Sequence, residues 1–247
     1  MTTARYLIVG ATSAIAEAFA ARAAAAGGAL YLAARNVERL VALEKDLGFH
    51  GAAAVLTAVL DVSDRHALAQ LPARAAAHLG GLDIIFLAHG VLPAQERCES
   101  DPEVLAALVE TNTLSTWILA AAGARELAAR GGGTLVILSS VAGDRGRRGN
   151  YAYGASKAAL DCFAEGLFHR YWRDGVNVLT VKPGFVDTPM TADMAKGLLW
   201  AQPDTIARDI THAIDARRRV LYSPWFWRPI MSVVRALPTA LFKRMSF

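Results

Sequence analysis

The chain has 247 residues, 54% of them hydrophobic and 19% charged, with a formal net charge of +4. A chain of this length and apolar content can form one well-buried domain, and it favours one domain over two. The two cysteines belong to no CxxC motif or Cys/His cluster, so the sequence indicates neither a disulfide framework nor a metal site.

The N-terminal residues and the hydropathy pattern bear on location. The start, M-T-T-A-R, lacks the charged region, apolar stretch and cleavage site of a signal peptide. No run of about 18 uninterrupted apolar residues predicts a membrane-spanning helix. We therefore expect a cytoplasmic protein.

Short apolar strands alternate with Ala- or Leu-rich helices along the chain. In chain order we expect a strand over 6–10, a helix to about 26, a strand over 29–34, a helix over 37–47, a strand over 54–60, a helix over 64–79, a strand over 82–88, a helix over 102–130 interrupted around Asn112, a strand over 133–140, a helix over 152–174, and strands over 177–184 and 219–224. The strands are continuous apolar runs, as a parallel sheet buried on both faces requires. The pattern predicts an α/β fold, a single Rossmann-type doubly wound domain with helices on both faces.

The first strand-to-helix turn reads V-G-A-T-S-A-I-A over 9–16. Gly10 ends the strand, and Ala14 and Ala16 open the helix, where backbone N–H groups and the helix dipole favour an anion. An alanine is tolerable at the two later positions as long as φ stays negative there. The turn alone is a weak signal in an Ala-rich chain, so its interpretation depends on the other motifs.

A second motif carries acid–base chemistry. In Y-G-A-S-K, Tyr153 and Lys157 lie four residues apart on one helix face. An ammonium beside a phenol lowers the phenol's pKa, so the tyrosine can exchange a proton near neutral pH. Ser140 ends the fifth strand, where its hydroxyl can bind a carbonyl, and Asn112 can hold a water that joins the lysine to solvent. Each residue alone has an ordinary structural interpretation, but their joint order favours catalysis.

Together these motifs resemble the short-chain dehydrogenase/reductase family along residues 5 to about 225. The resemblance implies an NAD(P)-dependent oxidoreductase that interconverts a ketone and a secondary alcohol, with Asn112, Ser140, Tyr153 and Lys157 as catalytic residues and no metal. It implies cofactor binding by Gly10, Thr12, Ser13, Ala14, Ile15, Arg35, Asp61, Val62, Ala88, Gly90, Tyr153, Lys157, Pro183, Gly184, Val186 and Thr188. The chain departs from the family pattern in its cofactor turn and at position 89, a histidine.

Charge at the end of the second strand bears on cofactor choice. An acid there usually binds the ribose hydroxyl of NAD, whereas Arg35 suits the 2′-phosphate of NADP. We therefore expect NADP(H), with NAD(H) as the alternative. Asp61 either binds the adenine amino group, as the resemblance implies, or is a carboxylate near a helix start. His89 is more readily explained as a local hydrogen-bonding group than as a catalytic one.

The C-terminal segment differs in composition from the rest. Residues 217–247 contain seven Lys or Arg residues and no acid. Their positive charge exceeds the net charge of +4 of the whole chain, so the rest of the chain has a negative net charge. We therefore divide the chain into a catalytic domain, 1–224, and a basic aromatic tail, 225–247. Basic residues with tryptophans are typical of a peptide on a membrane surface or beside a lipid substrate. The alternative is packing on the domain or on a second subunit. Pro229 and Pro238 are expected to break the tail into short helices, and nucleic acid fits it poorly.

Residues 177–247 also resemble one branch of the family, which reduces decaprenylphosphoryl-2-keto-erythro-pentofuranose. This narrower resemblance, carried by V-L-Y-S-P-W-F-W-R-P-I-M, implies a lipid-linked keto-sugar substrate, a flavin oxidase partner and a peripheral location on the inner membrane face. The alternatives are a soluble reductase of an acyl or other small ketone, and a non-catalytic dinucleotide sensor.

The family resemblance also implies a homo-oligomer formed through the helices at 102–130 and 152–174. Segment 190–200 is expected to cover the substrate as a lid.

Overall fold

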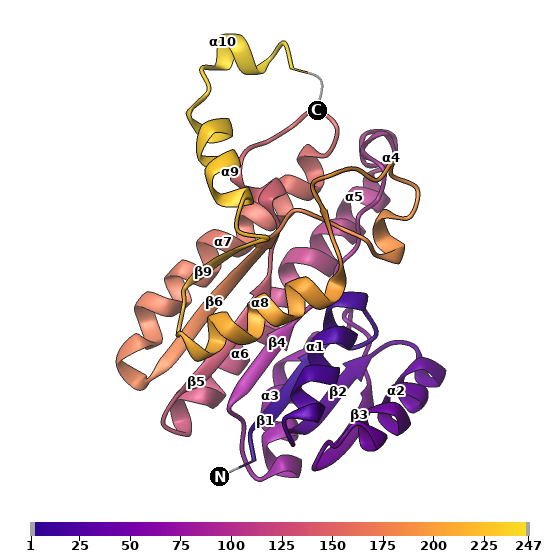
Figure 1. Cartoon of the computed structure of the whole chain (residues 1–247), viewed down its shortest axis with the longest axis vertical. Coiled ribbons are helices and arrows are strands. Elements are labelled where there is room, and N and C mark those ends of the chain that lie inside the picture. The colour runs from indigo at the N-terminus through magenta and orange to yellow at the C-terminus, as the bar shows by residue number, and fades with distance from the viewer. Residues whose placement is uncertain (1–2, 246–247) are drawn as a thin grey trace.

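A parallel β-sheet runs through the structure, a computed structural model that describes residues 3–245 (Figure 1). Its strands are β1 Arg5–Val9, β2 Ala29–Ala34, β3 Ala54–Val59, β4 Ile84–Leu87, β5 Gly133–Leu138, β6 Val176–Pro183 and β9 Val220–Ser223. Their order across the sheet is β3-β2-β1-β4-β5-β6-β9, with every neighbouring pair parallel. Two short strands, β7 Phe185–Val186 and β8 Trp200–Ala201, pair separately. Residues 1–2 of the predicted domain and 246–247 of the predicted tail lie outside the described residues.

Helices cover both faces of this sheet. They are α1 Ala14–Ala25, α2 Val37–Phe49, α3 Arg65–Leu79, α4 Gln95–Ser100, α5 Pro102–Val109, α6 Ser115–Ala129, α7 Tyr151–Tyr171, α8 Pro203–Asp215, α9 Trp227–Ala236 and α10 Thr239–Phe242. Buried residues of α1, α2 and α8 form one apolar core against the sheet, and those of α3, α6 and α7 form a second core. Figure 1 shows α8 beside α1 across one face. The predicted doubly wound α/β fold is confirmed.

Local chemistry explains where these elements begin and end. Every residue of β2 and of β6 is buried; β2 is accordingly an unbroken apolar run, whereas β6 also buries the polar side chains of Asn177, Thr180 and Lys182. Asn36 and Asp64 cap α2 and α3, each accepting a hydrogen bond from the backbone N–H three residues ahead. Gly27, at a φ of +76°, follows the end of α1, close to the predicted helix end at about 26.

The helix predicted over 102–130 is interrupted where expected. A π-helical turn, Glu110–Leu114, joins α5 to α6 and contains the fully buried Asn112. By length and composition alone, the stretch Pro102–Ala129 could cross a membrane. However, Leu119 and Leu127 of α6 are completely buried in the core that α6 shares with α3 and α7, so α6 is a core helix of the domain.

Two helices were absent from the sequence prediction. Helix α4 is short, and α8 begins at Pro203, a favoured residue in a first helical turn. The buried residues Ile206, Ile210 and Ala213 recur at helical spacing along α8. That periodicity was the signal that could have identified α8.

The tail leaves the sheet after β9 and forms α9 and α10, at the top of Figure 1 and far from the N-terminus. The prediction that Pro229 breaks this segment is wrong. Pro229 lies in the first turn of α9, where a backbone N–H has no intrahelical partner to lose. Pro238 does separate α9 from α10.

The inner face of the tail packs on the domain. Trp227 and Met231 are 4% and 1% exposed and contact Val141, whereas Trp225 is 77% exposed. Trp227 therefore packs on the domain, as the alternative to a membrane contact expected. Only part of the apolar tail surface remains open to another partner.

Candidate active site

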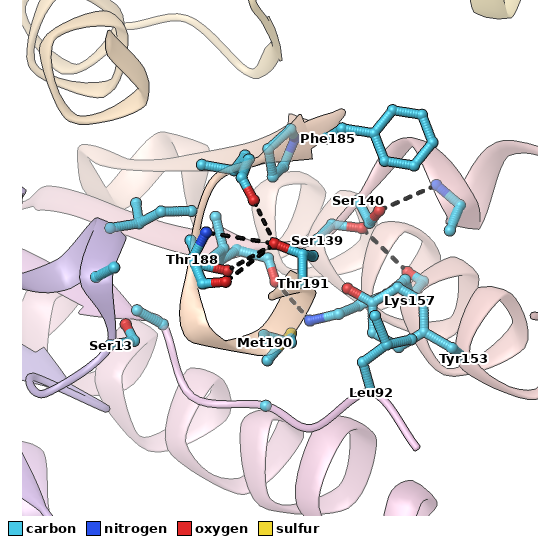
Figure 2. Close-up of a pocket in the computed structure, with 18 of the residues that line it drawn as sticks. Ser13, Leu92, Ser139, Ser140, Tyr153, Lys157, Phe185, Thr188, Met190 and Thr191 are labelled. Carbon is cyan, nitrogen blue, oxygen red and sulfur yellow. Dashed lines mark hydrogen bonds between the residues drawn. The ribbon is translucent and has the colours of Figure 1, made fainter. Parts of the chain in front are cut away.

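One cavity of about 720 Å³ lies at the carboxyl ends of the central strands. Thr12 after β1, Ala88 after β4, Ser140 after β5 and Gly184 after β6 all line it. The strand order reverses between β1 and β4, and this is where doubly wound sheets bind ligands. Figure 2 shows the cavity with many of its lining side chains.

Three of the predicted catalytic residues meet in this cavity. Ser140, Tyr153 and Lys157 all line it, the serine from the loop after β5 and the other two from α7 (Figure 2). The Ser140 hydroxyl oxygen accepts a hydrogen bond from the Ala142 N–H at 3.1 Å, which fixes its side chain. The Lys157 Nζ donates to the Leu138 carbonyl at 2.9 Å and lies 5.7 Å from the centre of the Tyr153 ring.

Burial is the main influence on the pKa values of Tyr153 and Lys157. It raises the pKa of Tyr153 to about 12, against an opposing hydrogen bond with Ser140. Burial also lowers the pKa of Lys157 to about 8, although Asp161 favours its charged form. The prediction that the phenol pKa is lowered is therefore wrong for the protein alone. A neutral phenol is a proton donor, which suits the tyrosine to the acid role.

Asn112 supports the site from behind, and it does not line the cavity. Its Oδ1 accepts from the Val91 N–H at 2.8 Å, and its Nδ2 donates to the Val91 carbonyl at 2.9 Å. A Cβ on the neighbouring Gly90 would lie 3.2 Å from the Asn112 Oδ1 and 3.6 Å from the Lys157 Nζ. Asn112 therefore holds the loop after β4 close to the Lys157 amine. Its predicted role in a proton relay stays a prediction.

His89 lines the cavity as a neutral, locally bonded side chain. Its Nε2 lies 2.8 Å from the Ser115 hydroxyl, which itself donates to the Thr111 carbonyl, and 3.1 Å from the Thr116 hydroxyl. Burial, together with the charge of Lys157, lowers the pKa of His89 to about 3. This agrees with its interpretation as a hydrogen-bonding group.

The turn after β1 fits a dinucleotide. Gly10 has a φ of +74°, and a Cβ there would approach the His89 backbone nitrogen to 2.6 Å. Ala14 and Ala16 lie in regular helix, outside the positive-φ positions, so their methyl groups are accommodated. The Ser13 Oγ is buried without a hydrogen-bond partner within residues 3–245. A polar atom left unpaired at a helix N-terminus is suited to a phosphate oxygen.

We expect Gly10→Ala to destabilise the fold through this close approach. Gly27→Ala is the matched control, because Gly27 has a φ of +76° and nothing within 4 Å of its added Cβ. Both substitutions carry left-handed strain, but only Gly10→Ala adds a clash with backbone. Denaturant unfolding should show a loss about 1–3 kcal/mol greater for Gly10→Ala than for Gly27→Ala. Equal losses would contradict the close approach.

The structure gathers most of the predicted cofactor residues around the cavity. Those that line it are Thr12, Ser13, Ala14, Ile15, Arg35, Ala88, Gly90, Tyr153, Lys157, Pro183, Gly184, Val186 and Thr188. Gly10, Asp61 and Val62 are not among the lining residues. The exposed Asp61 accepts a hydrogen bond from the Ser63 N–H at 2.9 Å, and the cap of α3 is instead Asp64. The adenine contact predicted for Asp61 stays a prediction.

Several lining residues were missed by sequence reasoning. Arg39 lies in the first turn of α2, whereas Arg35 precedes that helix, and Arg39 pairs with Glu17. Leu92 adds apolar surface, and Arg147 lines the cavity from the loop before α7, whereas Met190 and Met194 line it from the predicted lid. The place of Arg39 at the start of the helix expected directly after Arg35 was a usable signal, whereas the direction of Arg147 depends on the loop's backbone.

Comparisons with known proteins agree on the fold and the chemistry. A family model described as short chain dehydrogenase matches residues 5–198. An uncharacterised oxidoreductase of Mycobacterium tuberculosis is 38% identical over 225 residues, which are 91% of this chain and 90% of that protein. A short-chain type dehydrogenase/reductase from Mycobacterium ulcerans has a TM-score of 0.79 at 22% identity, covering 90% of this chain and 89% of that one. A variant of actinorhodin polyketide ketoreductase with NADPH has a TM-score of 0.80 at 24% identity, covering 90% and 95%.

Proposed function

The chain belongs to the short-chain dehydrogenase family and is an oxidoreductase, and we propose that it uses NADPH to reduce a ketone to a secondary alcohol. The observation that carries this proposal is the meeting of Ser140, Tyr153 and Lys157 in one cavity that continues to the turn after β1. The Tyr153 phenol, with a pKa raised to about 12, is protonated at neutral pH and can therefore serve as the acid in the reduction direction.

Each side chain has a distinct task in the proposed reaction. The nicotinamide supplies the hydride when it is bound. The Ser140 hydroxyl, already held by the Ala142 N–H, orients the substrate carbonyl and stabilises charge developing on its oxygen. The Tyr153 hydroxyl donates the proton to that oxygen. The Lys157 ammonium binds the nicotinamide ribose and stabilises the phenolate that remains.

Two arginines support the choice of NADPH. Arg35 and Arg39 line the cavity, as Ser13 does, and no described Asp or Glu lines it with them. Guanidinium groups suit a 2′-phosphate, and a carboxylate in their place would repel it. NADPH is also present with the ketoreductase of similar fold.

We expect Arg35→Ser to weaken NADPH binding while leaving NADH binding unchanged. The loss of a charged hydrogen bond to phosphate should raise the NADPH Kd about tenfold or more. NADH, which lacks that phosphate, is the internal control in the same fluorescence titration. Equal weakening of both cofactors would mean that Arg35 acts on the fold of the site and has no part in choosing NADPH.

For the substrate we propose a ketone on a lipid-linked pentose, supplied by a flavin-dependent oxidase partner. The resemblance of residues 177–247 to the keto-pentose-reducing branch motivates this choice. Phe185, Met190 and Met194 contribute apolar lining to the cavity, and Figure 2 shows Phe185 and Met190. Phe185 stacks on Trp200 with ring centres 5.5 Å apart and meets Trp227 of the tail at 5.7 Å. The tail therefore lies next to the side of the cavity that a lipid chain would follow.

The deciding experiment is NADPH oxidation by the purified protein with a polyprenyl-phosphoryl 2-keto-pentose in detergent. A ketoacyl thioester runs in parallel, for the alternative of a soluble reductase of small ketones. Turnover of the lipid-linked ketone supports the proposal. Turnover of the thioester alone supports the alternative, and absence of turnover with either would leave the dinucleotide-sensor alternative.

The remaining parts of the proposal concern location and assembly. We propose that residues 1–224 act as the catalytic domain and that the tail touches the inner membrane face through Trp225, Val233 and Leu241, which are 77%, 63% and 55% exposed. Sedimentation with anionic vesicles tests this contact. We also propose a homo-oligomer formed through α6 and α7, which size-exclusion chromatography tests.

A further inference from the structure

The active-site cavity carries an excess of positive charge. Arg35, Arg39, Arg147 and Lys157 line it, none of the described lining residues is an Asp or Glu, and of the four cations Arg39 is paired with Glu17 outside the lining. Arg35 and Arg39 lie at the proposed cofactor end, and Lys157 is part of the proposed catalytic set. Arg147 is the cation that neither role explains.

Arg147 differs from the other arginines in its loop. In D-R-G-R-R-G, the Arg145 guanidinium donates to the Leu237 carbonyl at 2.7 Å and lies 3.8 Å over the Phe242 ring, so it holds the tail. Arg148 is exposed. Arg147 is half-buried, lines the cavity, and has an Nε that is buried without a hydrogen-bond partner in the described part of the chain.

The nearby carboxylate does not satisfy this guanidinium. Asp144 is three residues away, but its two oxygens bind the Lys182 ammonium and the Tyr222 hydroxyl. Burial lowers the pKa of Arg147, with Asp144 only partly opposing the shift. A partly desolvated guanidinium with an unpaired N–H is costly to keep without an acceptor, and an oxyanion is the acceptor that its fork geometry matches.

We propose that Arg147 is a specificity-determining residue that binds an oxyanion of the substrate, a phosphate or a carboxylate, beside the reacting ketone. This rests on the proposed function, since it takes the Arg147 end of the cavity as the substrate end. The substrate class is then an anionic ketone. Neutral ketones of the same size leave the Arg147 Nε unpaired and bind more weakly.

The test is calorimetric titration of the NADPH-loaded protein with two matched pairs of ketones. Dihydroxyacetone phosphate is compared with dihydroxyacetone, and acetoacetate with methyl acetoacetate. Wild-type protein should bind the anionic member of at least one pair about tenfold tighter or more. Whichever pair shows the difference identifies the oxyanion as phosphate or carboxylate.

Two variants make the result specific to Arg147. Arg147→Gln should abolish the preference for the anion and leave the NADPH Kd unchanged, whereas Arg148→Gln, a change of the same kind one residue away, should keep the preference. No preference in the wild type, or a preference that survives Arg147→Gln, overturns the proposal. Weaker NADPH binding by Arg147→Gln also overturns it, because the residue then belongs to the cofactor site.

Turnover is measured separately on the same ketones, by NADPH oxidation. Anion binding that depends on Arg147 in a protein that reduces none of them would support the oxyanion site and count against the proposed reaction. Reduction of neutral and anionic ketones with equal kcat/KM would support the reaction and overturn the role of Arg147. The two failures are therefore distinguishable.

Discussion

Replacing Tyr153 by Phe is expected to lower kcat/KM for ketone reduction by about 10²–10⁴-fold. The substitution removes only the hydroxyl that donates the proton, and it retains the ring that packs in the cavity. Burial holds the pKa of this phenol at about 12, so at neutral pH nearly every wild-type molecule has the donor in its active form. The measurement is initial-rate NADPH oxidation, with the NADPH Kd determined in parallel and expected to change little.

Tyr151 provides the matched control for this substitution. It lies two residues earlier in α7, is 48% exposed and directs its hydroxyl to Glu99, away from the catalytic group. Tyr151→Phe should keep wild-type turnover. If Tyr153→Phe retains most of its activity, or if both variants lose activity equally, the phenol of Tyr153 is not the proton donor.

Local sequence signals were sufficient for most of the fold. The strand predicted over 29–34 matches β2 residue for residue, because an apolar run buried on both faces has no ambiguity of phase. The break predicted at Asn112 is a π-helical turn, since a fully buried asparagine needs partners outside the helix and finds them at Val91. Helix α8 was missed although Ile206, Ile210 and Ala213 recur among polar residues at the spacing of an amphipathic helix.

The residue types of the candidate site could be predicted from the sequence, whereas the burial and direction of its side chains could not. Ser140, Tyr153 and Lys157 could be found from spacing and from a family resemblance, and the structure brings them into one cavity. The pKa of Tyr153 could not be predicted from the sequence, because it depends on how far the phenol is buried. The role of Arg147 could not be predicted from the sequence either. Three arginines within four residues read alike, and only the loop's path shows that Arg145 contacts the tail while Arg147 faces the cavity.

A buried ion network behind Ser140 is a further feature that composition could not reveal. The Lys182 ammonium lies 2.8 Å from an Asp161 oxygen and also binds Asp144, whose side chain is 1% exposed. Asp161 accepts a hydrogen bond from Ser139 at 2.6 Å, and Asp144 accepts one from Tyr222 at 2.8 Å. The network therefore ties the loop that carries Ser140 to α7, β6 and β9.

Lys182→Met should destabilise the protein by about 3–5 kcal/mol at neutral pH, since it leaves two buried carboxylates without their cation. Burial alone would lower the pKa of Lys182, but Asp161 and Asp144 outweigh it and raise that pKa, so the wild-type lysine is charged. Burial already raises the pKa of Asp161 against the opposing effect of Lys182. Without the lysine that pKa rises further, and protonation at lower pH removes the unpaired charge. The deficit measured by denaturant unfolding should therefore shrink as the pH falls.

Lys196→Met is the control, with the same substitution at an exposed ion pair. Lys196 lies 2.7 Å from Asp187, but its side chain is 54% exposed, so its loss should cost less than about 1 kcal/mol. Adding Asp161→Leu to Lys182→Met should recover part of the lost stability, because it removes one of the two unpaired charges that the single variant leaves. A Lys182→Met variant as stable as Lys196→Met at neutral pH would mean that Asp144 and Asp161 are hydrated or protonated in the native protein. The network would then contribute nothing to holding the Ser140 loop.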